Sequence, residues 1–186
     1  MPSSYTDLGL ELMVTGENSG TWGDKTNTNL ELIQQGFAGY QEVSIAGGAQ
    51  TTALAVTDGT VSNGRNAVIK FTGTITGNQV VTIPDSIEKT YTIINGTTGA
   101  FTVEFKTVSG TGFTFAAADK GTRLAYADGT NVVDVNAAFT TISQFTLPTA
   151  DGTTGQAILT NGSGALSFGA AGISTGKAIA MAIVFG

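Results

Sequence analysis

The sequence predicts a mainly β protein with an antiparallel β-sandwich or barrel-like body and one short N-terminal α-helix. From residue 41 onward, apolar and polar residues alternate with a period of two, which is the pattern of half-buried strands. Asn-Gly and Asp-Gly pairs, such as Asn95-Gly96 and Asp128-Gly129, recur between these runs. Such pairs favour tight turns because they tolerate a positive φ.

The only convincing helical pattern lies before residue 41. We expect the helix to begin at Asp24, whose carboxylate can cap the free N–H groups of the first turn. One apolar stripe at helical spacing follows, formed by Leu30, Ile33 and Phe37. Gly36 and Gly39 weaken the helix and are expected to end it. The stripe fits either a cap over an open sheet edge or a surface that docks a partner.

Nine strands are expected in the body. They cover Glu42–Ala46, Thr52–Val56, Ala67–Thr72, Gln79–Ile83, Lys89–Asn95, Phe101–Thr107, Phe113–Ala116, Thr122–Tyr126 and Asn131–Val135. The strand at 89–95 and the strand at 101–107 are expected to form a hairpin through the loop 96–99. Many short strands separated by turns predict a sandwich or barrel-like body.

A change of composition near residues 137–148 divides the chain, since only Asp151 and Lys177 are charged beyond it. We therefore expect an N-terminal attachment region (1–40), a β-body (41–136) and a low-charge C-terminal assembly segment (137–186). The last segment has too little apolar material for a core of its own. Its final run alternates Ala with larger apolar side chains, Ile179, Met181, Ile183 and Phe185. This run would pair either with a neighbouring subunit or within its own chain.

Composition argues against several classes of function. The net charge is −6 and the eight basic residues are scattered, so nucleic-acid binding is not expected. The chain has no His and no Cys, which removes the common nucleophile–base systems and most zinc sites. No carboxylate pair has a distinctive spacing. We therefore expect no enzymatic activity, no cofactor and no metal, and the final apolar run is too short for membrane insertion.

The stretch Gly20–Ile33, GTWGDKTNTNLELI, resembles the N-terminal region of tail-fibre and appendage proteins of tailed bacteriophages, especially cyanophages and other marine phages. The positions that carry the resemblance are Gly20, Thr21, Trp22, Gly23, Asp24, Asn27 and Asn29. Two later stretches are similar to fibre segments: Tyr91–Thr107 together with Thr130–Asp134, and Leu147–Phe168. Only eighteen residues follow Phe168, which argues against a large receptor-binding tip.

The resemblance implies a virion structural protein that is made in the bacterial host cytoplasm and assembles as an intertwined homotrimer. Its partners would be tail, baseplate or capsid proteins, with a host-surface glycan as a further candidate. The expected attachment residues are Trp22, Gly23, Asp24, Asn27, Asn29, Leu30, Ile33 and Phe37. The alternatives to a short fibre or adaptor are a capsid decoration protein and a glycan-binding module.

Overall fold

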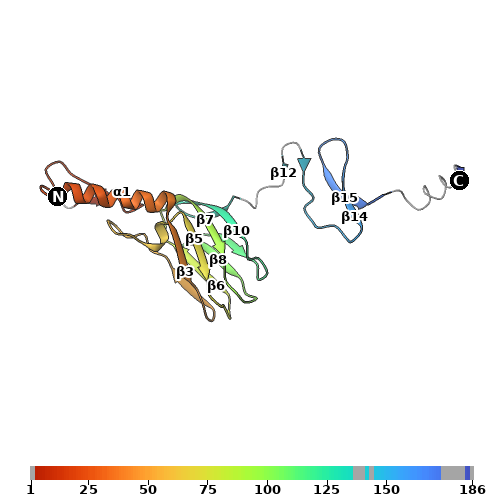
Figure 1. Cartoon of the computed structure of the whole chain (residues 1–186), viewed down its shortest axis with the longest axis horizontal. Coiled ribbons are helices and arrows are strands. Elements are labelled where there is room, and N and C mark those ends of the chain that lie inside the picture. Colours follow the sequence, from red (N-terminus) through yellow and green to blue (C-terminus); the bar gives the residue numbers. More distant parts are fainter. Residues whose placement is uncertain (1–2, 136–140, 143–144, 173–182, 185–186) are drawn as a thin grey trace. The chain divides into compact units, whose positions relative to one another are not determined.

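The computed structural model describes residues 3–135, 141–142, 145–172 and 183–184. The chain forms two compact units, Met1–Asn136 and Ala137–Gly186. Unit 1 holds the helix and two facing sheets, and unit 2 holds two short hairpins (Figure 1). The mainly β fold with a sandwich-like body and one N-terminal α-helix is therefore confirmed.

The helix α1 spans Trp22–Ala38, and its N-cap, Thr21, lies three residues before the N-cap that we expected. Thr21 occupies the N-cap but makes no side-chain cap hydrogen bond. Asp24 lies inside the first turn, so its predicted role as N-cap is wrong, although a carboxylate there still faces the positive end of the helix dipole. The helix passes through Gly36 and ends at Gly39, whose N–H donates to the Gln35 carbonyl.

The two sheets of unit 1 contain all nine of the expected strands. The first sheet has the order β11-β10-β7-β5-β3, with β3 (Tyr40–Ser44), β5 (Val68–Thr72), β7 (Glu88–Asn95), β10 (Thr122–Asp128) and β11 (Val132–Asp134). The second has the order β4-β6-β8-β9, with β4 (Gln50–Ala53), β6 (Gln79–Ile83), β8 (Val103–Thr107) and β9 (Gly112–Phe115). A short 3-10 helix, η1 (Asn63–Arg65), connects β4 to β5.

The pairing of these strands differs from the antiparallel arrangement that we expected. The chain alternates between the sheets from β3 to β8, so β3, β5 and β7 pair in parallel, and so do β4, β6 and β8. Only β9, β10 and β11 add antiparallel strands. The predicted hairpin between β7 and β8 is wrong, because the two strands belong to different sheets.

The corners between the sheets explain this pairing. The loops that form these corners are joined by hydrogen bonds to the next such loop along the chain: Gly47 N–H donates to the Thr74 carbonyl, and Ile75 N–H donates to the Thr98 carbonyl. A Cβ on Gly99, where φ is +106°, would overlap the Ile75 carbonyl, so this corner depends on glycine. The loop 96–99 therefore hydrogen-bonds to the loop between β5 and β6, and it leads the chain into the other sheet instead of forming a hairpin.

The core lies between the two sheets and is rich in aromatic residues. Phe105 is fully buried at its centre, with ring centroids of Phe71, Tyr91 and Phe113 at 6.0, 5.7 and 6.0 Å. The Tyr91 hydroxyl donates to the Gly64 carbonyl at 2.9 Å, which satisfies the one polar group of this cluster. Unit 1 thus has a complete core within a single chain.

Unit 2 lacks such a core in its described residues. It consists of the hairpins β12–β13 (Thr141–Ile142 and Phe145–Thr146) and β14–β15 (Gln156–Thr160 and Leu166–Ala170). None of residues 145–172 is buried, and Ile158 and Leu159 remain 57% and 45% exposed. Because isolated hairpins are marginally stable in water, unit 2 needs further surface to pack against.

Gly36→Ala is expected to stabilise unit 1 by about 0.5–1 kcal/mol, because alanine has the higher helix propensity. The added Cβ would lie 3.8 Å from the Arg65 Cγ, an ordinary contact. Gly39→Ala is the matched control: its Cβ would overlap the Gln35 carbonyl and the Asn66 side chain, so this variant should lose stability. Thermal unfolding of both variants measures the difference, and equal shifts would contradict the placement of Gly36 inside the helix.

Candidate functional site

The apolar stripe of α1 is exposed in the single chain. At 100° per residue, the stripe covers an arc of about 80°. Its members and their exposed fractions are Trp22 (65%), Leu30 (58%), Ile33 (51%) and Phe37 (87%). The helix packs on unit 1 through a different side, where Leu32 is 1% exposed. The stripe is therefore exposed to solvent in the single chain, and it is a large apolar surface for one helix.

The other attachment residues that we expected lie in two different settings. Gly23 is half-buried, with open space where a Cβ would lie. Asn27 is exposed about 60° beyond the stripe, and Asp24 is exposed on the opposite side of the helix. Asn29 instead holds the N-terminal segment: its Oδ1 accepts from Glu11 N–H, and its Nδ2 donates to the Glu11 carbonyl, both at 2.9 Å. The structure thus places Asn29 in an internal clamp.

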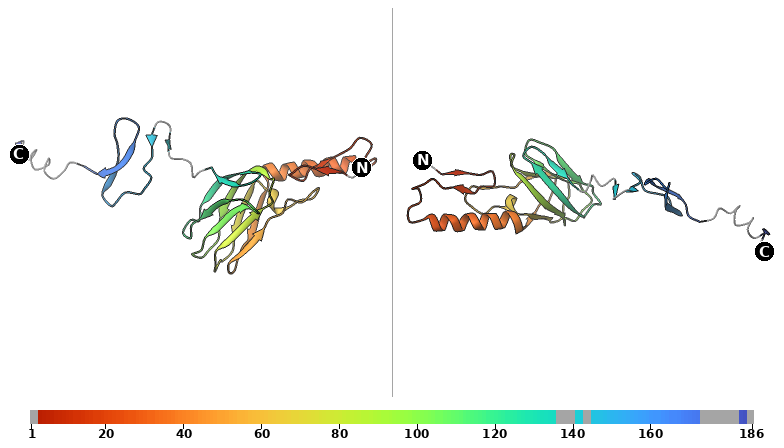
Figure 2. Two further views of the ribbon diagram at one scale, coloured as in Figure 1. Left: turned by 180° about the vertical axis from the view of Figure 1, so that it is seen from behind. Right: turned by 90° about the horizontal axis from the view of Figure 1, so that it is seen from above.

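This clamp fastens a hairpin, β1 (Ser4–Tyr5) and β2 (Glu11–Leu12), along α1, as Figure 2 shows. The Glu11 carboxylate is buried; it pairs with the Lys25 ammonium at 2.8 Å and accepts from the Ser3 hydroxyl at 2.6 Å. Lys25 first, and then Ser3, hold the pKa of Glu11 below its ordinary value. The N-terminal segment and the helix therefore form one layer.

Acid should release this segment from the helix. Because the pKa of Glu11 is lowered in the folded chain, its contribution is present above the ordinary value of 4.5 and is lost as the pH falls through the lowered pKa. The protection factors of the amides at residues 4–12, which correct for the intrinsic exchange rate at each pH, should fall in that range, and Glu11→Gln should show the lower protection already at pH 7. If exchange in Glu11→Gln keeps the wild-type pH profile, the carboxylate does not hold the segment.

Arg65 connects the N-terminal segment, α1 and the loop that follows β4. Its guanidinium is fully buried and donates to four oxygens: the Leu8 carbonyl at 2.7 Å, Gln35 Oε1 at 3.0 Å, and the Thr60 and Thr57 carbonyls at 2.7 and 2.5 Å. None of these oxygens carries a full negative charge. Burial lowers the pKa of Arg65, an effect that the more distant Asp58 partly opposes.

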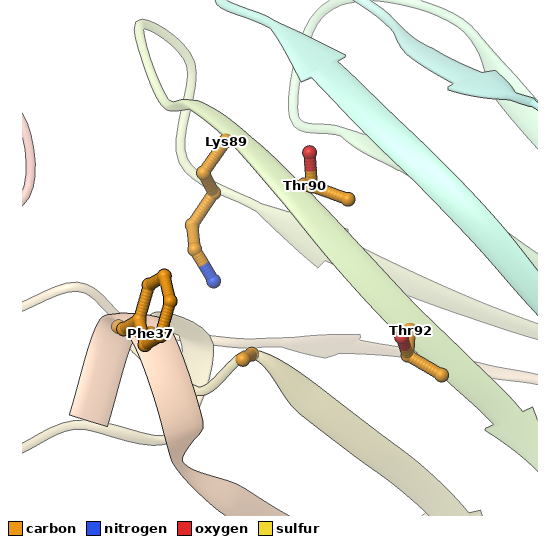
Figure 3. A pocket seen from close by; sticks show the side chains of 6 residues that line it. Phe37, Lys89, Thr90 and Thr92 are labelled. Atoms are coloured by element: carbon orange, nitrogen blue, oxygen red, sulfur yellow. The ribbon is translucent and has the colours of Figure 1, made fainter. Parts of the chain in front are cut away.

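A two-part groove opens between the end of α1 and β7. Figure 3 shows Lys89 extending from β7 with its nitrogen directed toward Phe37. One part, of 430 Å³, is lined by Ala67, Thr90 and Thr92 in addition to the residues that both parts share. The other part, of 220 Å³, is lined by apolar residues, Leu8, Leu10, Leu32 and Ile33. Both parts share Gly36, Phe37 and Lys89.

The sequence did not reveal Arg65 or Lys89 as members of this site. Each is a single basic residue, and the contacts that define its role come from segments far apart in the chain. The C-terminal residues that we expected at an interface are described only at Ile183, which is 78% exposed. Ile179, Met181 and Phe185 lie outside the described residues.

Within the described ranges, no cluster of acidic side chains is arranged to hold a metal ion. Among the described helices, none has the length and apolar character needed to span a bilayer. The candidate site is an apolar helix stripe, adjoined by a groove that contains the Lys89 ammonium. Comparison of the chain with protein-family models, curated proteins and solved structures finds no match.

Proposed function

We propose that this chain is a non-enzymatic structural protein of a tailed-phage virion, a short tail fibre or an adaptor that docks through α1. The observation that carries the proposal is the exposed stripe of Trp22, Leu30, Ile33 and Phe37, in a unit whose own core is already complete. Exposed aromatic and aliphatic anchors on one helix face are typical of helix-in-groove docking. The GTWGD stretch that resembles phage appendage proteins covers the start of the same helix.

Unit 2 supports an assembly role in a different way. Its described hairpins expose Ile158 and Leu159, and residues 145–172 include no buried side chain. We propose that three copies of the chain associate through this unit, so that each hairpin completes its packing on its neighbours. In this arrangement unit 2 holds the copies together and α1 attaches them to a tail, baseplate or capsid protein.

Imaging of labelled particles tests the assignment. A gold label on the chain should decorate the tail or the tail vertex of purified virions. A label spread across the shell would identify a capsid decoration protein instead. A label that is absent from particles but binds host cells, and is displaced by host glycans, would favour the glycan-binding alternative.

Trp22→Ala should leave unit 1 folded and reduce incorporation into particles. Trp22 is 65% exposed, so its truncation should change the unfolding free energy of unit 1 by less than about 0.5 kcal/mol. An interface tryptophan, in contrast, typically contributes about 2 kcal/mol or more, which is a factor of about 30 in affinity. The measurement is the copy number per particle in virions grown with the variant. A wild-type copy number would show that Trp22 is not part of the docking surface.

A further inference from the structure

The groove beside α1 contains a half-buried ammonium, that of Lys89, which no carboxylate of the described chain neutralises. The Lys89 ammonium donates to the Arg65 carbonyl at 2.9 Å and to the Asn66 carbonyl at 3.0 Å, and lies 3.9 Å from the centre of the Tyr91 ring. The described ion pairs include neither Lys89 nor Arg65. Burial, followed by the repulsion from Arg65, lowers the pKa of Lys89 to about 8.

The two parts of the groove differ in chemistry. The larger part is lined by Lys89 and by two polar residues of the same strand, Thr90 and Thr92. The smaller part is apolar apart from Lys89, with three leucines and Ile33 in its wall. The parts meet at Phe37, so a ligand that spans them needs an anionic group and an apolar group only a few atoms apart.

We infer that this groove binds an acidic–apolar segment of a partner protein, with an Asp or Glu carboxylate against Lys89 and the next apolar side chain among Leu8, Leu10 and Leu32. The inference rests on the proposed docking role of α1, because Ile33 and Phe37 belong to both the stripe and the groove. The positive charge of Lys89 favours a carboxylate as the anionic group. Because the groove is continuous with the apolar stripe, it favours a protein segment as the ligand. At 220 Å³ the apolar part is smaller than a typical pocket for a drug-sized molecule.

The charged groups around Lys89 allow a pH test. Arg65 faces it from η1 and Tyr91 from β7, and burial raises the pKa of Tyr91, which keeps the phenol neutral. Asp7 and Glu88 are exposed and line a neighbouring hollow beyond Leu8, without an ion pair to Lys89. The α1 residues that line the groove do not titrate. Lys89 is therefore the group whose charge should control carboxylate binding between pH 7 and 10.

Calorimetric titration of the full chain with acetyl-Glu-Leu-Leu-amide and acetyl-Gln-Leu-Leu-amide tests the inference directly. At pH 7 the Glu peptide should bind about tenfold more tightly than the Gln peptide, since a hydrogen bond between charged groups is the stronger. Above the Lys89 pKa of about 8, its affinity should fall towards that of the Gln peptide. Amide NMR shifts should locate binding at Gly36, Phe37 and Thr92.

Two variants separate charge from folding. Lys89→Gln keeps a donor for the Arg65 carbonyl and should bring the Glu:Gln affinity ratio close to one. Phe37→Ala changes a residue that is 87% exposed, so the variant should fold, and its affinity for both peptides should fall by the same factor.

Equal binding of the two peptides to the wild-type chain, or a pH-independent affinity ratio, would overturn the inference. Binding of octanoate without binding of the Glu peptide would also overturn it and assign the groove to small carboxylates. Particle labelling is unaffected by either result, so the proposed function is judged separately.

Discussion

Arg65→Met should destabilise unit 1 by about 3–5 kcal/mol, the largest effect that we expect from a single substitution. The guanidinium is fully buried and donates to four oxygens in three segments, and methionine fills the space without donating to any of them. Each buried oxygen that loses its donor costs about 1–3 kcal/mol. Stabilities of single domains are about 5–15 kcal/mol, so the loss is a large fraction of the total. Urea unfolding, followed by the fluorescence of the aromatic core, measures it.

Lys106→Met is the matched control for charge. Lys106 is half-buried on β8 and the loss of positive charge is the same, but within the described chain its ammonium makes none of the side-chain hydrogen bonds that Arg65 makes. This variant should stay within about 0.5 kcal/mol of wild type. If Arg65→Met also stays within about 1 kcal/mol, the four hydrogen bonds do not hold the N-terminal segment, α1 and the loop after β4 together.

The double variant Leu30→Glu and Phe37→Glu should abolish attachment to particles while unit 1 remains folded. Both side chains are mostly exposed in the single chain, so charges are tolerated there. In a docked interface the same charges would be buried among apolar groups without partners, which weakens binding on the order of a hundredfold or more. Copy number per particle and the thermal midpoint of the purified variant measure the two effects.

A second double variant controls for the added charge. Gln34→Glu and Ala38→Glu place two carboxylates on exposed positions of α1 that lie about 40–80° beyond Leu30 around the helix. Attachment should persist in this variant. Loss of attachment in both double variants would show that net charge, rather than the apolar stripe, controls docking.

Local patterns predicted the strands but not their partners. The alternation in Phe101–Thr107 is set by neighbouring residues, and β8 is found within that range. The pairing of the strands depends on the loop between β7 and β8, where Thr98 N–H donates to the Gly73 carbonyl in the loop between β5 and β6. Glycine-containing turns occur both in hairpins and in such corners, so the turn residues alone could not distinguish antiparallel from parallel pairing.

The helix shows a similar limit at the candidate site. The sequence predicted the stripe of Leu30, Ile33 and Phe37, yet helical spacing cannot tell which side of the helix faces its own domain. Leu32 is the residue of α1 that is buried in unit 1, and the Asn29 side chain, one turn earlier, hydrogen-bonds to the backbone of Glu11. Polar contacts to Glu11 thus replace the apolar packing that a stripe usually provides. For this reason the stripe remains exposed and available for docking.

The central claim is that surfaces left uncovered by the single chain are covered by other chains. Light scattering of the purified full-length protein tests it most directly, because no particle or partner is needed. Association through unit 2 predicts a mass three times that of the 18.9 kDa chain, stable on dilution, with slow amide exchange in β14 and β15. A monomer of 18.9 kDa at all concentrations, with rapid exchange in both strands, would contradict the account.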